Sequence, residues 1–345
     1  MSDNQSVTPK AEPRKAGFSL SSPGVSKFLE VYGIVLVVVV MMIVLALIKP
    51  EVFLSPQNLT NILKQNASLA LLALGMYVVI VTAGIDLSVG SIMALAMVAL
   101  AIASKAGVPW PLVLLIGPAI GLAVGWVNGV GLTVLKLPHP FIMTLGTLNV
   151  ARGLTYLISN GAPVSGLQPE VRYLGQAYYD LGIFAPPAGI PASLILVAVC
   201  AVGLWFFMQR TSMGRHIFAI GGNPHAARVS GINVDGTLVV VYMISGFFAG
   251  LAGLLLAGRT DSGFPNAGIG IELDAIAAVI IGGASFFGGR GTVLGVMAGV
   301  LIMGILRNGL NINNVSAFWQ QILIGLVIII AVYIDVLRRR ASQRR

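Results

Sequence analysis

Charged side chains are scarce in this chain of 345 residues. Only 10% of the residues are Asp, Glu, Lys or Arg, whereas 57% are hydrophobic. Because an ordinary soluble domain has about 25% charged residues, this composition excludes a typical soluble fold. The hydrophobic residues also come in blocks, and about 20 consecutive apolar residues form a helix that spans the hydrocarbon core of a bilayer. The sequence therefore predicts an integral membrane protein of the all-α class.

The chain also lacks the residue patterns of enzymes and metal centres. Its single cysteine, Cys200, lies in an apolar block and has no second cysteine for an intrachain disulfide. The three histidines, His139, His216 and His225, are scattered, with no carboxylate or cysteine at ligand spacing. No Gly-x-x-x-x-Gly-Lys-Ser/Thr segment is present to cradle a nucleotide phosphate. We expect a chain that is not an enzyme and that holds no metal or cofactor of its own.

Lysine and arginine outnumber the acidic residues and give a formal net charge of +9. No basic face with interleaved aromatic residues accompanies this charge, so it does not predict nucleic-acid binding. The cations instead lie at the ends of apolar blocks, and cytoplasmic loops of membrane proteins carry an excess of Lys and Arg. Placing both termini in the cytoplasm puts most of these cations inside. The charge pattern therefore predicts two cytoplasmic termini.

About ten transmembrane helices are predicted, and an even number agrees with termini on one side of the membrane. The expected organisation is a disordered cytoplasmic tail over 1–27, a transmembrane domain over 28–337 and a basic cytoplasmic tail over 338–345. A loop over 49–65 is expected outside, where its second half forms an interfacial helix. The loop over 160–189 is expected to be periplasmic and ordered, and that over 210–236 to be cytoplasmic. The apolar blocks lie near 31–48, 66–82, 88–104, 111–134, 139–159, 190–209, 237–258, 273–286, 292–309 and 318–337.

Two short patterns recur in the two halves of the chain. The segment 84–87, Gly-Ile-Asp-Leu, is similar to the segment 270–273, Gly-Ile-Glu-Leu, and an Asn-Gly pair follows each at 128–129 and 308–309. In the predicted topology the two segments lie on opposite sides of the membrane, as inverted repeats would place them. Chance similarity between glycine-rich helices is the alternative.

The cytoplasmic loop contains the signals of a short helix. Asn223 is a good N-cap, Pro224 suits the first helical position, and Gly231 suits the left-handed residue that ends a helix. Two helical turns are therefore expected between two membrane spans. They form either a well-made connection or a rigid docking element for a cytoplasmic partner.

Three motifs in this order resemble ribose-type sugar permeases of bacterial ABC importers. They are Gly-Ile-Asp-Leu-Ser-Val-Gly-Ser at 84–91, the loop from Thr211 to Val234 with Ala-Ile-Gly-Gly-Asn inside it, and Glu-Leu-Asp-Ala-Ile-Ala-Ala-Val-Ile-Ile-Gly-Gly-Ala-Ser at 272–285, followed by Gly-Gly-Arg-Gly at 288–291. The resemblance covers roughly residues 30–337. It implies a type II importer permease in the bacterial inner membrane that forms the pathway for a monosaccharide or related polyol.

The same resemblance implies the partners of the chain. They are a second permease copy, identical or related, a periplasmic sugar-binding protein and a separate cytoplasmic ATPase that holds ATP and Mg. The ATPase would contact the short cytoplasmic helix, through Gly222, Asn223, Pro224, Ala226, Ala227, Arg228 and Gly231.

Polar side chains within or beside the apolar blocks are candidates for the translocation pathway or its gate. A polar group in hydrocarbon is costly, so it usually faces a partner, a cavity or water. The candidates are Asn66, Asp86, Ser88, Asn128, Asn149, Arg152, Tyr156, Glu272, Asp274, Asn308 and Gln320.

Each of these residues also has a purely structural interpretation. Asp86 could cap the helix that begins near Leu87, and Glu272 and Asp274 could cap the eighth block. Arg152 could pair with Asp86 or Asp274, or extend outward from its helix. Asn128 and Asn308 could bond neighbouring helices.

Two other functions compete with sugar import. One is a branched-chain amino-acid permease of the same superfamily, although the motif at 84–90 and the Gly-Gly-Asn loop favour sugar. The other is an ion-coupled secondary transporter, which would need a coupling site within the membrane and no docking helix for an ATPase.

Overall fold

The computed structural model describes residues 23–137, 139–179 and 189–343. The chain divides into two units, residues 1–33 and 34–345. In the first unit the described residues belong to the start of helix α1. All the packing reported below lies within the second unit.

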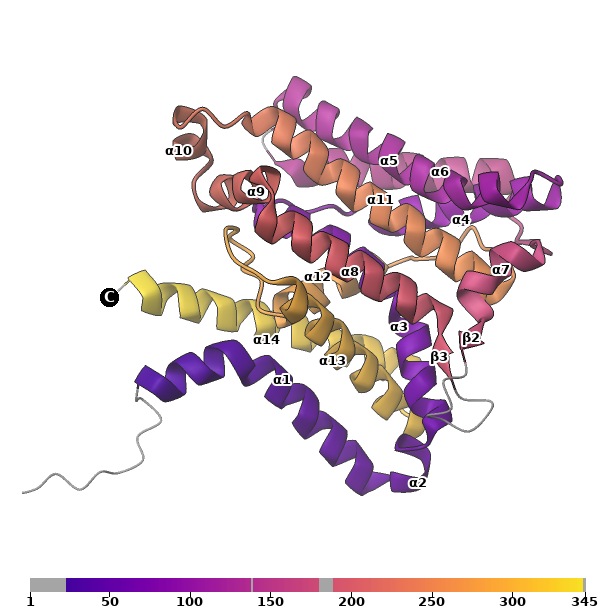
Figure 1. Cartoon of the computed structure of the whole chain (residues 1–345), viewed down its shortest axis with the longest axis horizontal. Coiled ribbons are helices and arrows are strands. Elements are labelled where there is room, and N and C mark those ends of the chain that lie inside the picture. Colours follow the sequence, from indigo (N-terminus) through magenta and orange to yellow (C-terminus); the bar gives the residue numbers. More distant parts are fainter. Residues whose placement is uncertain (1–22, 138, 180–188, 344–345) are drawn as a thin grey trace, which may run out of the picture. The chain divides into compact units, whose positions relative to one another are not determined.

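The described residues form an almost entirely helical fold, which confirms the all-α class (Figure 1). Two antiparallel pairs of two-residue strands are the exception. The strands are β1 Val164–Ser165 with β4 Ser262–Gly263, and β2 Tyr178–Tyr179 with β3 Ile190–Pro191. The helices are α1 Pro23–Ile48, α2 Pro50–Phe53, α3 Pro56–Val81, α4 Val89–Lys105, α5 Trp110–Leu135, α6 Pro140–Ser159, α7 Pro169–Gln176, α8 Ala192–Arg210, α9 Ser212–Gly222, α10 Pro224–Val229, α11 Val234–Thr260, α12 Ile271–Ile281, α13 Val293–Ile312 and α14 Ala317–Gln343.

Six helices in the described part of the chain are long and apolar enough to cross a membrane. They are α3, α5, α6, α8, α11 and α13. Each of the ten predicted blocks overlaps a helix. Helix α12 has 11 residues, which corresponds to about 16 Å and is too short for a hydrocarbon core of about 30 Å.

Helices α3 and α11 lie at the centre of the packing. The C-terminal half of α3, from Leu71 to Val81, is buried throughout. Helix α11 packs along α5 through glycines, because a Cβ on Gly121 of α5 would collide with the carbonyl oxygen of Gly246 of α11. Such small residues allow membrane helices to approach closely.

Several predicted boundaries are wrong. Helix α3 begins at Pro56, and Ser55 caps it by accepting a hydrogen bond from the backbone N–H of Asn58. Residues 56–65 are therefore the first turns of α3 and not a separate interfacial helix. Helix α12 ends at Ile281, before the predicted end at 286, because Gly282 follows and Gly283 adopts a left-handed conformation.

The predicted tails also differ from the structure. Helix α1 begins at Pro23, inside the expected tail of 1–27, and α14 continues to Gln343, through most of the expected tail of 338–345. Residues 1–22 and 344–345 lie outside the described residues, as do 180–188 of the expected periplasmic loop.

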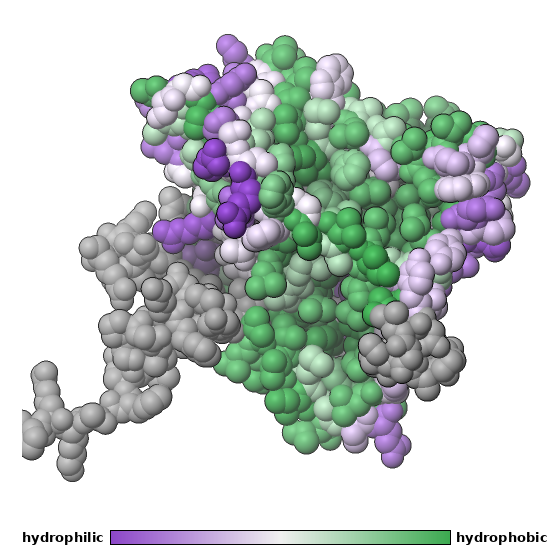
Figure 2. All heavy atoms as spheres, viewed as in Figure 1, coloured by the Kyte–Doolittle hydropathy of each residue, from purple (hydrophilic) through white to green (hydrophobic). Residues whose placement is uncertain are grey.

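Hydrophilic residues gather in two places on the face shown in Figure 2. One group covers α9 and α10, the other surrounds α7, and hydrophobic residues cover the surface between them. Helix α11 connects the two places, since it starts directly after α10 and contacts α7 near its end. This arrangement suits a membrane protein with water-exposed ends and an apolar middle.

Candidate functional site

The predicted cytoplasmic helix is present as α10. The Asn223 side chain accepts a hydrogen bond from the backbone N–H of Ala226, Pro224 opens the helix, and Gly231 follows it with a φ of +84°. All three residues therefore have the local roles that the sequence indicated. Residues 212–222, expected as part of a loop, form helix α9, which Thr211 caps through the backbone N–H of Gly214.

Helix α10 presents one buried side and one exposed side. Ala227 is buried in a small apolar cluster with Ile220 of α9 and Val234 of α11. The opposite side is solvent-exposed, with Arg228 held by an ion pair of 2.8 Å to Asp235. The exposed residues there are Gly222, Asn223, Pro224, Ala226, Arg228 and Gly231. Six of the seven predicted coupling residues are thus accessible, and Ala227 anchors the helix.

The third sequence motif meets helix α9 at the end of α3. The backbone N–H of Gly289 donates to the carbonyl oxygen of Val81 at 2.8 Å. A Cβ on Gly221 of α9 would collide with the same carbonyl oxygen, so α9, α3 and the glycine turn are in backbone contact. Displacement of α9 and α10 would therefore act directly on the end of the central helix α3.

A buried polar cluster surrounds Asp86, between α3 and α4. One carboxylate oxygen accepts hydrogen bonds from the hydroxyl and the backbone N–H of Ser88, at 2.6 and 3.0 Å, and the other accepts from the Ser245 hydroxyl of α11 at 2.8 Å. The Asn128 amide of α5 donates to the Ser88 hydroxyl at 2.9 Å. Asp86, Ser88 and Asn128 are fully buried. The cluster therefore connects α4, α5 and α11 at one point.

Asp86 does not occupy the N-cap of α4. That position belongs to Ser88, whose side chain makes no capping hydrogen bond. Asn128 bonds a neighbouring element, as one interpretation expected. A role of these three residues in the gate stays a prediction, because their side chains have no exposed surface in a single copy of the chain.

A second polar group lies between α6 and the segment that precedes α12. The Arg152 guanidinium donates to the carbonyl oxygens of Pro265 and Ala267, both at 2.7 Å. The Tyr156 hydroxyl donates to the Asn266 side chain at 2.8 Å. The predicted pairing of Arg152 with Asp86 or Asp274 is wrong, since its guanidinium bonds carbonyl oxygens of a non-helical segment.

The remaining candidates lie mostly around α13. Asp274 of α12 forms an ion pair of 2.6 Å with Arg307. Asn308 exchanges two amide hydrogen bonds with Asn58 of α3, so it does bond a neighbouring helix. Gln320 of α14 donates to Asn311, and Asn66 donates to the carbonyl oxygen of Ile62 in its own helix. Glu272 lies in the first turn of α12, where Gly270 occupies the N-cap.

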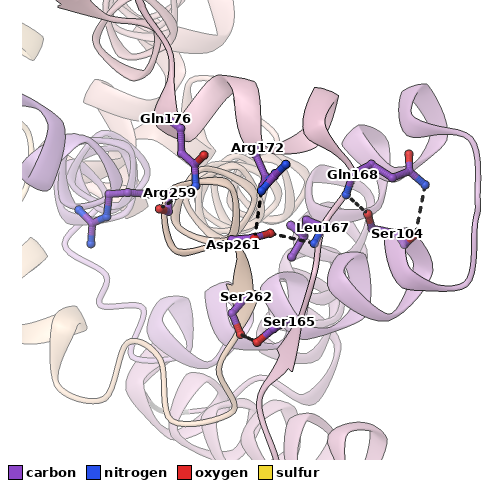
Figure 3. Close-up of polar contacts among 9 residues, drawn as sticks. All are labelled: Ser104, Ser165, Leu167, Gln168, Arg172, Gln176, Arg259, Asp261 and Ser262. Carbon is purple, nitrogen blue, oxygen red and sulfur yellow. Dashed lines mark hydrogen bonds and ion pairs between the residues drawn. The ribbon is translucent and has the colours of Figure 1, made fainter. Parts of the chain in front are cut away.

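A network of hydrogen bonds orders the described part of the predicted periplasmic loop (Figure 3). Asp261, at the end of α11, accepts from the backbone N–H of Leu167 at 2.9 Å and pairs with Arg172 of α7 at 3.2 Å. Gln168 bonds Ser104 at the end of α4 through both its backbone and its side chain. Residues 164–176 are thereby fixed to the ends of α4 and α11.

Sequence reasoning missed three residues of these clusters. Ser245 and Tyr242 lie one turn apart on α11, close to Asp86. Nothing in the sequence around them marks them as its neighbours. Asn266 lies in a Pro-Asn-Ala-Gly turn sequence, which was a usable sign of non-helical backbone before α12. Chain topology, rather than local pattern, brings these residues to their partners.

Comparison with known proteins connects these features to a family. Residues 58–332 match the model of the family described as branched-chain amino acid transport system / permease component. The chain belongs to this family. It is therefore a multi-pass membrane permease.

Individual relatives cover most of the chain. The ribose import permease protein of Bacillus subtilis is 41% identical over 86% of this chain and 89% of the relative. The D-allose transport system permease protein of Escherichia coli is 39% identical over 89% and 92%. The galactose/methyl galactoside import permease protein of Escherichia coli is 40% identical over 89% and 94%. No solved structure gives a significant match. The resemblance to sugar permeases is confirmed.

Proposed function

We propose that this chain is the permease subunit of an ATP-driven importer and forms the membrane pathway for a monosaccharide or a related polyol. The observation that carries this proposal is the set of relatives at about 40% identity, which are import permeases for ribose, allose and galactose. These relatives do not favour branched-chain amino acids as the cargo, despite the description of the family model.

The structure supports a docking role for α10. The helix is capped at its first residue, anchored by Ala227 and exposed on its opposite side. Through α9 it is in backbone contact with the end of α3 and with the glycine turn at 288–289. An ATPase that grips α10 from the cytoplasm and holds ATP and Mg itself would move these elements together. An ion-coupled transporter would have no use for such an element.

The other partners follow from the same proposal. A periplasmic binding protein delivers the sugar to the side that carries α7, and a second permease, identical or related, completes the pore. In this arrangement both termini lie in the cytoplasm, 160–189 lies in the periplasm and 210–236 in the cytoplasm of a bacterial inner membrane. The transmembrane domain spans 28–337, with about ten membrane helices and the two halves related as inverted repeats.

Association with the ATPase tests the docking role. Ala227→Pro removes the backbone N–H that bonds the Asn223 carbonyl oxygen at 3.0 Å, and proline within a helix costs about 3 kcal/mol. We expect this variant to lose co-purification with the ATPase of its transporter, while the matched Ala227→Ser variant retains it. Equal recovery of the ATPase with both variants, in protein that remains monodisperse, would contradict the assignment.

A further inference from the structure

One face of α6 carries polar side chains where a membrane helix should contact lipid. Asn149, Arg152 and Tyr156 recur at intervals of three and four residues, so they lie on the same face of the helix. Asn149 is exposed, and Tyr156 is 39% exposed despite its bond to Asn266. Helix α6 is one of the six helices that are long and apolar enough to span a membrane. Only 22% of its most apolar stretch is buried inside the protein. Lipid contact at this face would leave these polar groups in hydrocarbon.

Depth along α6 excludes a simple placement at the membrane surface. Arg152 lies seven residues before the end of the helix at Ser159, which corresponds to about 10 Å, and Asn149 lies near the helix centre. The guanidinium of Arg152 does not extend outward to the interface, because it is held by the carbonyl oxygens of Pro265 and Ala267. The polar face therefore extends into the apolar layer.

A non-helical segment lies beside this face at the same depth. Gly263 packs against Met97 and Val98 of α4, and Gly268 packs against Gly90 and Met93. Residues 263–268 thus descend along α4 by about 10 Å. Irregular backbone at membrane depth occurs where it is buried in protein or lines a water-filled cavity. Phe264 and Asn266 of this segment are exposed, so it is not fully buried.

Glu272 extends the polar surface into α12. It is half-buried in the first turn of that helix, close enough to Arg152 for their opposite charges to interact. A Cβ on Gly90 of α4 would lie 2.6 Å from a Glu272 carboxylate oxygen, which places this side chain beside the start of α4. This carboxylate is partly exposed, so it can contact water or a polar ligand in addition to the neighbouring charge of Arg152.

We propose that these five residues form the wall of the translocation pathway that contacts the sugar. We call this surface the polar wall. It consists of Asn149, Arg152 and Tyr156 of α6, Asn266 of the segment 263–268 and Glu272 of α12. This inference rests on the proposed function and adds the surface that a neutral, hydroxyl-bearing solute meets. Amide, phenol and carboxylate groups suit sugar hydroxyls, and their partial exposure gives weak contacts that allow release.

The neighbouring exposed flank of α6, turned by about 100° from the polar face, provides an internal control. Val150, Leu154 and Leu157 are 63%, 44% and 71% exposed and entirely apolar. We assign these three side chains to contact with lipid. The two faces of one helix should therefore differ in their access to water.

Cysteine accessibility tests the assignment with the full chain. Because Cys200 is the single cysteine in the sequence, Cys200→Ser gives a background without thiols. Asn149→Cys, Asn266→Cys, Val150→Cys and Leu157→Cys are then introduced one at a time and treated in membranes with a charged, membrane-impermeant methanethiosulfonate. A thiol in hydrocarbon remains protonated, so we expect the two wall positions to react at least about tenfold faster than the two lipid-facing positions.

The pattern of rates decides the outcome. The assignment of the polar wall would be contradicted by slow reaction at both wall positions. It would also be contradicted if Val150→Cys reacted as fast as Asn149→Cys. All four positions are exposed in the structure, and each variant is retained for comparison only if its expression and monodispersity match the background. The labelling requires neither ATP nor knowledge of the sugar, so its result is separate from failure of the import function. Slowing of the Asn149→Cys reaction by D-ribose in the assembled transporter would then place the sugar at this wall.

Discussion

The two segments that share the pattern Gly-Ile-Asp/Glu-Leu have opposite surroundings. At 84–87 the acid, Asp86, is fully buried and accepts hydrogen bonds from Ser88 and Ser245. At 270–273 the acid, Glu272, is half-buried, and Leu273 beside it is 53% exposed. Asn128 of α5 and Ser245 of α11 enclose the first segment, whereas Ile269 and Leu273 leave the second partly exposed. The same pattern therefore builds a structural junction in one half of the chain and part of a polar surface in the other.

The largest expected effect is the loss of the buried acid. Asp86→Leu leaves the hydroxyls of Ser88 and Ser245 without their acceptor in a buried site, and each such group costs about 1–3 kcal/mol. We expect a marked fall in the thermal unfolding midpoint of the detergent-solubilised protein. Asp86→Asn, which keeps an oxygen acceptor, should lose much less. Equal midpoints for Asp86→Leu and the unmodified chain would show that the junction contributes little.

A smaller effect on stability, but a clear one on transport, is expected at the other acid. Glu272→Ala removes a half-exposed carboxylate while Arg152 keeps its two carbonyl partners, so stability should change by about 0.5 kcal/mol or less. A hydrogen bond to a charged group contributes about 1.5–3 kcal/mol, so loss of one sugar contact should slow uptake by about ten- to a hundredfold. Leu154→Ala on the lipid-facing flank of α6 is the control and should transport normally. A large drop in the thermal unfolding midpoint of Glu272→Ala, with normal uptake, would show that Glu272 is a structural residue like Asp86.

The smallest expected effect distinguishes two tyrosine hydroxyls. Tyr242 is buried near Asp86, and its hydroxyl has no hydrogen-bond partner among the described residues. Tyr242→Phe should therefore leave the unfolding midpoint unchanged or slightly raised. Tyr156→Phe, which breaks the bond to Asn266 at the polar wall, should lower the uptake rate without changing the midpoint. The prediction is contradicted if Tyr242→Phe and Tyr156→Phe both lower the unfolding midpoint, or if both lower the uptake rate.

Local structure was predictable where the signal was local. The cap at Asn223, the proline at 224 and the glycine at 231 lie within nine residues of each other, and the structure confirms the helix that they predict. Residues 56–65 were expected to be helical, but their continuity with α3 was missed because polar residues such as Gln57 and Lys64 indicated a separate interfacial helix. The end of α12 before Gly282 could also have been predicted from the two consecutive glycines at 282–283. It was missed because the predicted block continued through the residues after them.

The partners of the polar residues were not predictable, because they come from distant parts of the chain. Asp86 meets Ser245 across 159 residues, and Arg152 meets Pro265 across 113. Sequence reasoning expected Arg152 to bind an acid, since charges in membranes usually pair. The structure instead provides carbonyl oxygens that are free because the segment before α12 is not helical.

Uptake by the reconstituted complex tests the central claim most directly. The chain is placed in proteoliposomes with the ATPase and the binding protein that the proposal assigns to it. Accumulation of labelled D-ribose, D-allose and D-galactose is measured with and without ATP. We predict that at least one of these sugars accumulates only when ATP is present on the ATPase side and that an ion gradient alone drives no uptake. Accumulation by the isolated chain under an ion gradient, without ATP or partners, would contradict the account.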